Sequence, residues 1–408
     1  MMKSKRQFRT PQGLIVCFLA ATCLIQSSSD AHQGTKVTDS TATRIVRPGV
    51  THKQVVSSRG PWIVNILQID LTQSELHIGA GRAFDRFFGR EKTSSIAQRH
   101  NTADHVVIAA LNADFFSLKT GEIENNNIID GTFVKGTPMT GSPFDTFDNV
   151  HSQFAMTRNR KPLIDRFAFE GSITWSHGVT TGLTGINDLP RLQSLILYSD
   201  SYGPTTPTDT LNIPIREWPL TPAGTRFDTL LCVVSGESST GGTPITTGSF
   251  VLSAYGRTEG SLTSFHKGDT VKVWTGLTPN RGPITTLVGG WPRLVLNGKN
   301  IAANADSLEG TFPRFSANRH PRSGVGFSQD STKVYFIIVD GRSEKSVGMS
   351  LIEFGDLMIA EGIYQGMNLD GGGSTTLVIN GTIVNSPTDP AGERPVGNCL
   401  LLFATKPK

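Results

Sequence analysis

The chain has 408 residues, a formal net charge of +4 at neutral pH, and only 18% charged residues. This length allows one large core or two domains. Residues 1–31 hold four basic residues and one acidic residue, so the net charge without them is +1. This balance gives no support to a nucleic-acid partner, and none is expected.

The first 31 residues are predicted to be a signal peptide. Basic residues precede the apolar stretch from Leu14 to Ile25, which is short for a membrane span, and Ser29-Asp30-Ala31 provides a cleavage site. Lipid attachment at Cys23 is an alternative. The protein is therefore predicted to be exported, to the periplasm or the medium, without a stable membrane span after cleavage.

Two cysteines, Cys232 and Cys399, remain after that cleavage. They either form one disulfide in an oxidising compartment or stay buried and free. Because they lie far apart in the chain, they do not indicate a metal site.

The N-terminal third is predicted to be rich in strands. Residues 32–52 are polar and are expected to form a linker. Pro61 to Leu71 is partly alternating and predicts a strand, with Leu76 to Gly81 as its hairpin partner. A short helix is expected over 94–100. Val106 to Leu111 is apolar throughout and predicts a buried strand.

That buried strand leads into Asn112-Ala113-Asp114, so these polar side chains are expected at a strand end. Three consecutive asparagines, residues 125–127, suit a loop better than a strand or a helix. Residues 176–287 then change in composition. Thr, Pro and Gly are dense there and short strand-like runs recur, which predicts a β-rich insertion.

The C-terminal part contains the clearest helix signal. Ser350 and Glu353 have the spacing of a capping box, and the apolar residues that follow recur on one helical face until Gly362. Strands are expected on both sides of this helix, ending at Asp340 and at Asp370. If these two strands are parallel neighbours, their carboxylates lie on one edge of a sheet.

The stretch from Asn368 to Thr376, NLDGGGSTT, is the strongest candidate for a site. Three consecutive glycines weaken packing and cost backbone entropy, so they indicate a backbone that a ligand approaches closely. Their amides can face an anion. A plain glycine-rich turn is the alternative explanation.

Several acidic and basic residues fall at loop ends near this stretch. Carboxylates suit an oxocarbenium-like centre or the activation of water, and arginine forks suit a phosphate. The sequence therefore favours a ligand that is both sugar and phosphate. The candidate residues are Asp114, Glu122, Arg322, Asp340, Arg342, Asp370, Glu393 and Arg394.

Other chemistries have weaker signals. The nine histidines show no zinc spacing, and there is no GxSxG, P-loop or GxGxxG motif. Ser374 has no histidine after it and is interpreted as a hydrogen-bonding loop residue rather than a nucleophile. Ca²⁺ or another divalent cation bound among Asp and Asn oxygens is a further hypothesis, without EF-hand spacing.

Six blocks together carry a resemblance to a known family. The family is the phosphodiester glycosidase family, which the chain resembles over roughly residues 105–135 and 285–403 through the blocks NADFF, GGWPRLVLNG, HPRSGVGFS, VDGRS, NLDGGGSTTLVING and ERPVGNCLLLF, in this order. The resemblance implies two parts of one domain, 53–175 and 288–408, around the insertion at 176–287. The fold expected is α+β, with a mixed, mostly antiparallel sheet, few helices and a β-rich insertion.

The resemblance also implies an exported hydrolase. It would remove a sugar such as N-acetylglucosamine from a sugar-1-phosphodiester in a glycan, by breaking the C1–O bond. The alternatives are a non-catalytic envelope protein that binds glycans and a phosphodiesterase that cuts P–O. Glu124 and the asparagines after it depart from the more apolar stretch of relatives, which puts the sugar preference in doubt.

Roles follow from the resemblance for twelve residues. Asp370 and Asp114 would act at the anomeric centre and on water, and Arg322 and Arg342 would hold the phosphate. The predicted catalytic residues are Asp114, Asp340, Asp370 and Glu393. The predicted phosphate or substrate ligands are Asn112, Arg322, Arg342, Gly371, Gly372, Gly373, Ser374 and Arg394.

Overall fold

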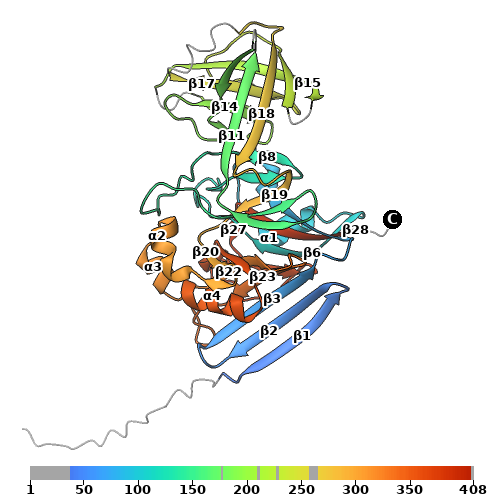
Figure 1. Ribbon diagram of the computed structural model, residues 1–408, viewed down its shortest axis with the longest axis vertical. Coiled ribbons are helices and arrows are strands. Elements are labelled where there is room, and N and C mark those ends of the chain that lie inside the picture. The colour runs from blue at the N-terminus through green and yellow to red at the C-terminus, as the bar shows by residue number, and fades with distance from the viewer. Residues whose placement is uncertain (1–36, 176–177, 209–211, 227–228, 257–264, 406–408) are drawn as a thin grey trace, which may run out of the picture. The chain divides into compact units, whose positions relative to one another are not determined.

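The computed structural model describes residues 37–175, 178–208, 212–226, 229–256 and 265–405 (Figure 1). The predicted signal peptide therefore lies outside the described residues. Strands dominate the fold, and α-helices are few: α1 (Thr93–Arg99), α2 (Ala305–Glu309), α3 (Pro313–Ala317) and α4 (Leu351–Ala360). Short 3₁₀ turns are η1 (Ala83–Asp85), η4 (Ala302–Asn304) and η5 (Gly372–Ser374).

The first large sheet has the order β1-β2-β3-β23-β22-β24-β20-β21. Neighbouring strands in this order are antiparallel throughout the described residues. Its strands are β1 (Ser40–Arg47), β2 (Val50–Ser57), β3 (Trp62–Asp70), β20 (Arg293–Leu296), β21 (Lys299–Asn300), β22 (Arg322–Phe327), β23 (Lys333–Val339) and β24 (Gln365–Leu369).

A five-stranded sheet has the order β26-β25-β6-β28-β4. Its strands are β4 (Leu76–Arg82), β6 (His105–Asn112), β25 (Leu377–Ile379), β26 (Thr382–Ile383) and β28 (Asn398–Thr405). Together the two sheets form a sandwich, because one buried cluster contains Phe336 and Ile338 from the first and Leu400 and Leu402 from the second.

Both outer faces of this sandwich are covered by helices. Residues of β23 alternate: Phe336 and Ile338 face the sandwich core, whereas Tyr335 and Ile337 pack with Phe354 of α4. On the other sheet, α1 packs against the outer face. Strands buried on both faces need apolar residues at every position, which explains the continuous runs at β6 and β23.

A second five-stranded sheet has the order β10-β9-β19-β7-β8, and a two-stranded sheet pairs β5 with β27. The strands are β5 (Glu91–Lys92), β7 (Asn127–Ile129), β8 (Thr132–Lys135), β9 (Gln153–Thr157), β10 (Pro162–Asp165), β19 (Ile284–Gly289) and β27 (Pro395–Val396).

A second eight-stranded sheet has the order β12-β11-β18-β16-β15-β17-β14-β13 and its own apolar core (Figure 1). It begins before residue 176, the predicted start of the insertion. Its strands are β11 (Ala168–Trp175), β12 (Val179–Gly182), β13 (Gly185–Ile186), β14 (Leu195–Ser199), β15 (Ile215–Arg226), β16 (Thr229–Val234), β17 (Phe250–Tyr255) and β18 (Thr270–Thr278).

Several predictions are confirmed. The sheets are mostly antiparallel, with β13–β14 the parallel pair among the described strands. Helix α4 begins after Ser350, whose side chain accepts from the Glu353 amide while the Glu353 carboxylate accepts from the Ser350 amide. The Asn380-Gly381 turn has the positive φ angles that a tight hairpin between β25 and β26 requires.

Three other predictions need correction. The described part of residues 32–52 is not a linker, because it contains β1 and the first three residues of β2. Strand β4 is not the hairpin partner of β3, since β3 pairs with β2 and β23 while β4 pairs with β28. The two cysteines do not pair: Cys232 and Cys399 are buried and free. No helix in the described ranges has the length and apolarity to cross a membrane.

Candidate active site

The candidate site lies where β22, β23 and β24 meet one edge of the first sheet. Strand β22 lies between the other two and is antiparallel to both, so β23 and β24 run in the same direction. Arg322 begins β22, while Asp340 and Asp370 follow the ends of β23 and β24. The expectation that the two carboxylates share an edge is therefore confirmed, but the two strands are not neighbours.

Asn112 joins this edge to the second sheet. It is the last residue of β6, and its side-chain oxygen accepts hydrogen bonds from the Ser323 hydroxyl at 2.7 Å and the Thr376 amide at 3.0 Å. Its side-chain amide donates to the Asp370 carbonyl at 2.5 Å. Asn112 is fully buried, so its role in the structure is to hold the glycine loop in place.

At each of the three glycines of the loop, a different neighbouring group leaves no room for a side chain. A Cβ on Gly371 would lie 2.7 Å from the Pro321 carbonyl oxygen, and Gly372 has φ +60°. A Cβ on Gly372 would lie 2.9 Å from the Arg342 guanidinium, and one on Gly373 would collide with that of Arg394. Two arginines therefore lie against bare backbone, which is a different arrangement from a plain glycine-rich turn.

A cavity of about 660 Å³ opens beside this loop. Asp370, Arg394 and Glu124 all contribute to its lining. Asp370 and Glu124 are partly exposed, while Asp114 is 1% exposed and lies buried close by. The cavity thus combines carboxyl groups and an arginine at one end, and it has room for a sugar phosphate.

Burial raises the pKa of all three carboxyl groups. The pKa of Asp370 rises to about 7, through burial and the charge of Asp114, against the Ser374 hydrogen bond and the Arg394 charge. The pKa of Glu124 rises to about 8, through burial and then the charge of Asp114. Burial raises the pKa of Asp114 to about 6, although two hydrogen bonds from Asn125 oppose this rise.

Carboxyl groups with separated pKa values can divide acid and base work between them. Near pH 7 the Glu124 carboxyl holds its proton, Asp370 is about half ionised and Asp114 is mostly ionised. The site therefore presents a proton donor and a carboxylate on the same cavity wall.

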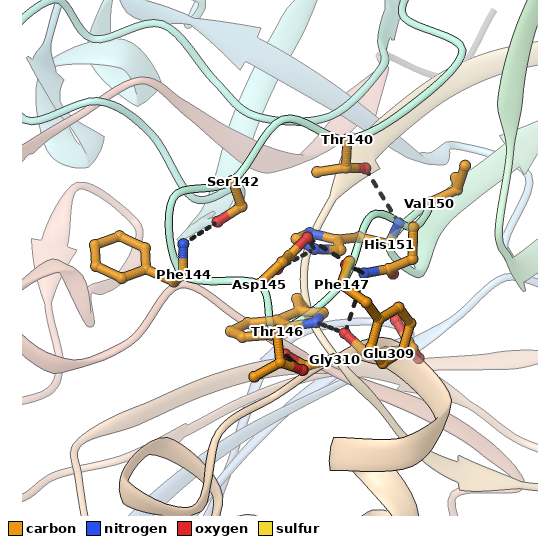
Figure 2. A network of polar contacts seen from close by, with 12 residues as sticks. Thr140, Ser142, Phe144, Asp145, Thr146, Phe147, Val150, His151, Glu309 and Gly310 are labelled. Atoms are coloured by element: carbon orange, nitrogen blue, oxygen red, sulfur yellow. Dashed lines mark hydrogen bonds and ion pairs between the residues drawn. The ribbon is translucent and has the colours of Figure 1, made fainter.

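A polar network that includes Thr140, Asp145 and His151 connects to Asp114 through Asn125, and Figure 2 shows the first three of these residues. Asn125 donates to the Asp114 carboxylate at 2.8 Å and accepts from the Thr140 hydroxyl at 2.9 Å. The same hydroxyl accepts from the backbone amide of His151, whose Nε2 lies 2.8 Å from Asp145. Ser142 and Phe144 line the cavity, so the network fixes the loop that carries them.

An aromatic wall closes another side of the cavity. Trp291 stacks on the His151 ring at 5.1 Å and on the Phe315 ring at 5.0 Å, and Phe115 meets Trp291 edge to face. The Trp291 indole nitrogen donates to the Glu309 carbonyl at 2.6 Å. Rigid aromatic side chains of this kind suit an apolar group of the ligand.

Other residues predicted for the site lie elsewhere or serve the structure. The Arg322 guanidinium is buried and donates to the carbonyls of Met349, Phe315 and Asn318, so it does not line the cavity. Glu393 is 7% exposed and accepts from the Ser94 amide and hydroxyl at the start of α1.

Asp340, Arg342 and Ser374 occupy intermediate positions. Asp340 is buried and accepts from the Ser386 amide, and burial raises its pKa to about 6. Arg342 is exposed beside Gly372 and does not line the cavity. Ser374 is buried and its hydroxyl lies 3.4 Å from Arg394, in agreement with a hydrogen-bonding role. Their part in the reaction stays a prediction.

The sequence did not identify some residues of the site. Glu124 was noted for its unusual neighbourhood, but not as an acid, and Asn125 and Trp291 were not selected. Lys135 lines the cavity and contacts Glu122 at 2.9 Å. One signal in the sequence could have indicated Glu124 and Asn125 as site residues: an acidic residue directly before three asparagines, in the segment that follows the strand ending at Asn112.

No metal centre is evident among the residues described. They contain no group of three or more His, Cys, Asp or Glu side chains that could hold a metal ion. The hypothesis of a bound divalent cation stays untested.

Comparison with known proteins supports the family. Residues 230–403 match the family described as Phosphodiester glycosidase. Over 114 residues, the chain is 30% and 32% identical to N-acetylglucosamine-1-phosphodiester alpha-N-acetylglucosaminidase of Mus musculus and of Bos taurus. These matches cover 26% of this chain and 22% and 21% of those proteins, so the chain spans about a fifth of their length.

Solved structures support the fold over a longer range. A hypothetical protein from Synechocystis has a TM-score of 0.70 and a protein from Burkholderia pseudomallei K96243 one of 0.69, both at 18% identity. Each match covers 90% of this chain, and 64% and 97% of those chains. Residues 230–403 of this chain are thus similar to the phosphodiester glycosidase family, and the curated relatives support this similarity.

Proposed function

We propose that this protein hydrolyses sugar-1-phosphodiesters at the anomeric C1–O bond, with N-acetylglucosamine as the first sugar to test. One observation carries the proposal: Asp370, Glu124 and Arg394 line one cavity of about 660 Å³ beside the glycine loop. The family and the curated relatives, whose name specifies this class of bond, support it. The proposal also includes export of the mature protein.

The reaction needs a carboxylate at the anomeric carbon and a route for one proton. Water adds to C1, the C1–O bond breaks, and its electron pair stays on the phosphate oxygen. In this proposal, ionised Asp370 stabilises the positive charge that develops at C1 and accepts the proton of water. Protonated Glu124 donates a proton to the departing phosphate, and Arg394 stabilises its negative charge.

The products are the free sugar and a phosphomonoester on the remaining alcohol. Phosphate is a good leaving group, so its charge needs stabilisation more than its oxygen needs a strong acid. Asp114 does not line the cavity and acts through its charge, which raises the pKa of both Asp370 and Glu124. It is therefore a positioning and tuning residue in this scheme.

A non-catalytic glycan-binding protein is the alternative. Aromatic residues on an exposed face of the β-rich sheet would support it. However, Tyr198, Tyr202, Trp218 and Tyr255 are buried in that sheet, and only Trp274 of this group is exposed, at 36%. The structure therefore offers no aromatic binding face among these five residues.

Product analysis in H₂¹⁸O tests the reaction. The mature protein is incubated with UDP-GlcNAc and with GlcNAc-1-phosphate esters, with and without EDTA, beside Asp370→Asn and the exposed control Asp104→Asn. Hydrolysis at C1–O puts ¹⁸O into the sugar and is lost only in the Asp370 variant. Label in the phosphate would show P–O cleavage and reject the assigned roles. If wild-type protein binds but does not turn over any ester, the binding protein is favoured.

A further inference from the structure

Large apolar side chains are exposed on three of the chain segments that contribute to the lining of this cavity. Among the described residues, fourteen large apolar side chains are exposed, and six of them come from three segments: residue 118, residues 139–147 and residues 189–192. They are Leu118, Met139, Phe144, Phe147, Leu189 and Leu192. We call these six residues the apolar rim. Such a concentration next to a site indicates a binding surface.

Three residues of the apolar rim line the cavity itself. Leu118 is 58% exposed, Phe144 60% and Leu189 41%, and all three contribute to the same wall as Asp370 and Glu124. The rim is therefore continuous with the candidate active site.

Between the rim and the carboxyl groups, the wall remains largely apolar. Phe115, Trp291, Phe312 and Phe315 line it, and Trp291 and Phe315 stack on each other. If the group on the other side of the phosphate were a second sugar, many of its hydroxyl groups would have no hydrogen-bond partner on this wall, which costs free energy. An alkyl chain would not incur this cost.

Two cations accompany the rim. Lys119 and Arg191 line the cavity and are exposed, and Arg191 has a distant ionic partner in Asp188 at 3.8 Å. Leu118 and Lys119 are adjacent in sequence, as are Arg191 and Leu192. Apolar surface next to positive charge complements an amphiphilic anion.

We infer that the substrate of this site is amphiphilic: a sugar-1-phosphate esterified to a long-chain alkyl or isoprenoid alcohol. This inference rests on the proposed function. The sugar occupies the end with Asp370, the phosphate lies near Arg394, and the chain leaves across the apolar rim. Hydrolysis by water at C1 then gives free sugar and a lipid phosphomonoester, with the alcohol–phosphate bond intact.

Matched esters test the inference. The full chain is assayed on GlcNAc-1-phosphate methyl ester and decyl ester, both below the concentration at which the decyl ester forms micelles. We expect kcat/KM for the decyl ester to exceed that for the methyl ester by ~30-fold or more, because each buried methylene contributes severalfold. In the triple variant Leu118→Ser, Phe144→Ser, Leu189→Ser, the ratio should fall below about 3.

Control variants and a binding measurement separate the outcomes. Leu308→Ser and Ile352→Ser remove exposed apolar side chains that do not line the cavity, and should leave the ratio unchanged. Calorimetry should show that decyl phosphate binds wild-type protein more tightly than methyl phosphate does, and that the triple variant loses this difference. This measurement requires no turnover, and the triple variant should still bind methyl phosphate as the wild-type protein does, whereas a misfolded variant would bind neither ligand.

Three results would overturn the inference. Equal kcat/KM on both esters would reject an amphiphilic substrate while the glycosidase stands. Hydrolysis of neither ester would reject the proposed function and the inference with it. Rim-dependent binding to phosphatidylglycerol vesicles that carry no sugar phosphate, together with equal kcat/KM, would show that the rim binds a membrane surface rather than the substrate.

Discussion

At the scale of single residues, environment separates acidic side chains that look equivalent in the sequence. Asp370 lines the cavity, and its pKa is raised. The Glu393 carboxylate instead accepts a hydrogen bond from the Ser94 amide in the first turn of α1. Both were candidate catalytic residues, because both follow or precede strands near an arginine. Local sequence does not reveal which carboxylate already has backbone partners, and in this site that difference determines the role.

This contrast leads to a paired prediction. Asp370→Asn should lower kcat/KM by about 10³-fold or more, since it removes the carboxylate at the anomeric centre. Glu393→Ala should leave kcat/KM within about threefold but lower the free energy of unfolding by about 1 kcal/mol, because α1 loses an acceptor for its Ser94 amide. Steady-state kinetics and urea unfolding measure the two effects. A stable but inactive Glu393 variant would contradict this assignment.

Glu124 should determine the alkaline limb of the pH profile. Its pKa is raised to about 8, so the protonated donor disappears above that pH, while ionisation of Asp370 near pH 7 forms the acidic limb. We expect a bell-shaped kcat/KM profile for the wild-type protein. Glu124→Gln should lower the plateau by 10-fold to 100-fold and abolish the alkaline limb. Profiles measured from pH 5 to pH 10 check this, and an unchanged alkaline limb in the variant would exclude Glu124.

At the scale of elements, the glycine loop and its two arginines act as one unit. Gly373 leaves room for the Arg394 guanidinium, and Arg394 in turn is held by Asp389 at 2.6 Å and lies 3.4 Å from Ser374. The loop therefore positions a cation beside Asp370 without an additional side chain. This explains why the sequence has no residue larger than glycine at three successive positions.

Gly373→Ala should weaken the site without unfolding the protein. The added methyl group meets the far end of a flexible side chain, so Arg394 moves away instead of the backbone. We expect KM for a phosphodiester to rise about tenfold, with a smaller change in kcat. Gly182→Ala is the matched control, because a Cβ there meets only a carbonyl oxygen at 3.9 Å and φ is not positive. Equal effects of the two substitutions would contradict the role of the loop.

Prediction from sequence succeeded where the signal is local. The capping box of α4 and the partial alternation of β3 both depend on neighbouring residues. The predicted pairing of β3 with residues 76–81 was wrong because β3 lies between β2 and β23, and β23 is more than 260 positions later in the chain. Likewise, β1 is largely exposed and polar, so its pattern resembled a linker although β2 pairs along almost its whole length.

At the scale of the whole molecule, the fold determines what the candidate site contains. Asp114 follows β6 of the five-stranded sheet, and Asp370 follows β24 of the first large sheet. Glu124 lies in the connection between β6 and β7. The resemblance identified the first two residues because they lie in recognisable motifs. It could not identify Asn125, Thr140 and His151, because their role comes from one hydrogen-bonded network that only the packed sheets bring together.

Burying several carboxyl groups should also make stability depend on pH. Glu124 and Asp370 have folded-state pKa values of about 8 and 7, far above those expected in the unfolded chain. Between pH 6.5 and pH 8 the folded state therefore binds more protons than the unfolded state, so stability falls as pH rises. Burial lowers the pKa values of His52, His77 and His320, so these residues contribute in the opposite direction near the acidic end of this window, where the unfolded chain still binds protons on its histidines.

The effect should be measurable and should map to one residue. From pH 6.5 to pH 8, Glu124 alone should cost on the order of 1–2 kcal/mol of unfolding free energy, which lowers Tm by a few degrees. In Glu124→Gln most of this slope should vanish, because the amide does not titrate, whereas the exposed control Asp104→Asn should keep it. Calorimetry across this range decides the matter. A variant with the wild-type slope would show that Glu124 is already ionised in the folded protein at neutral pH, and it would also remove the proposed proton donor.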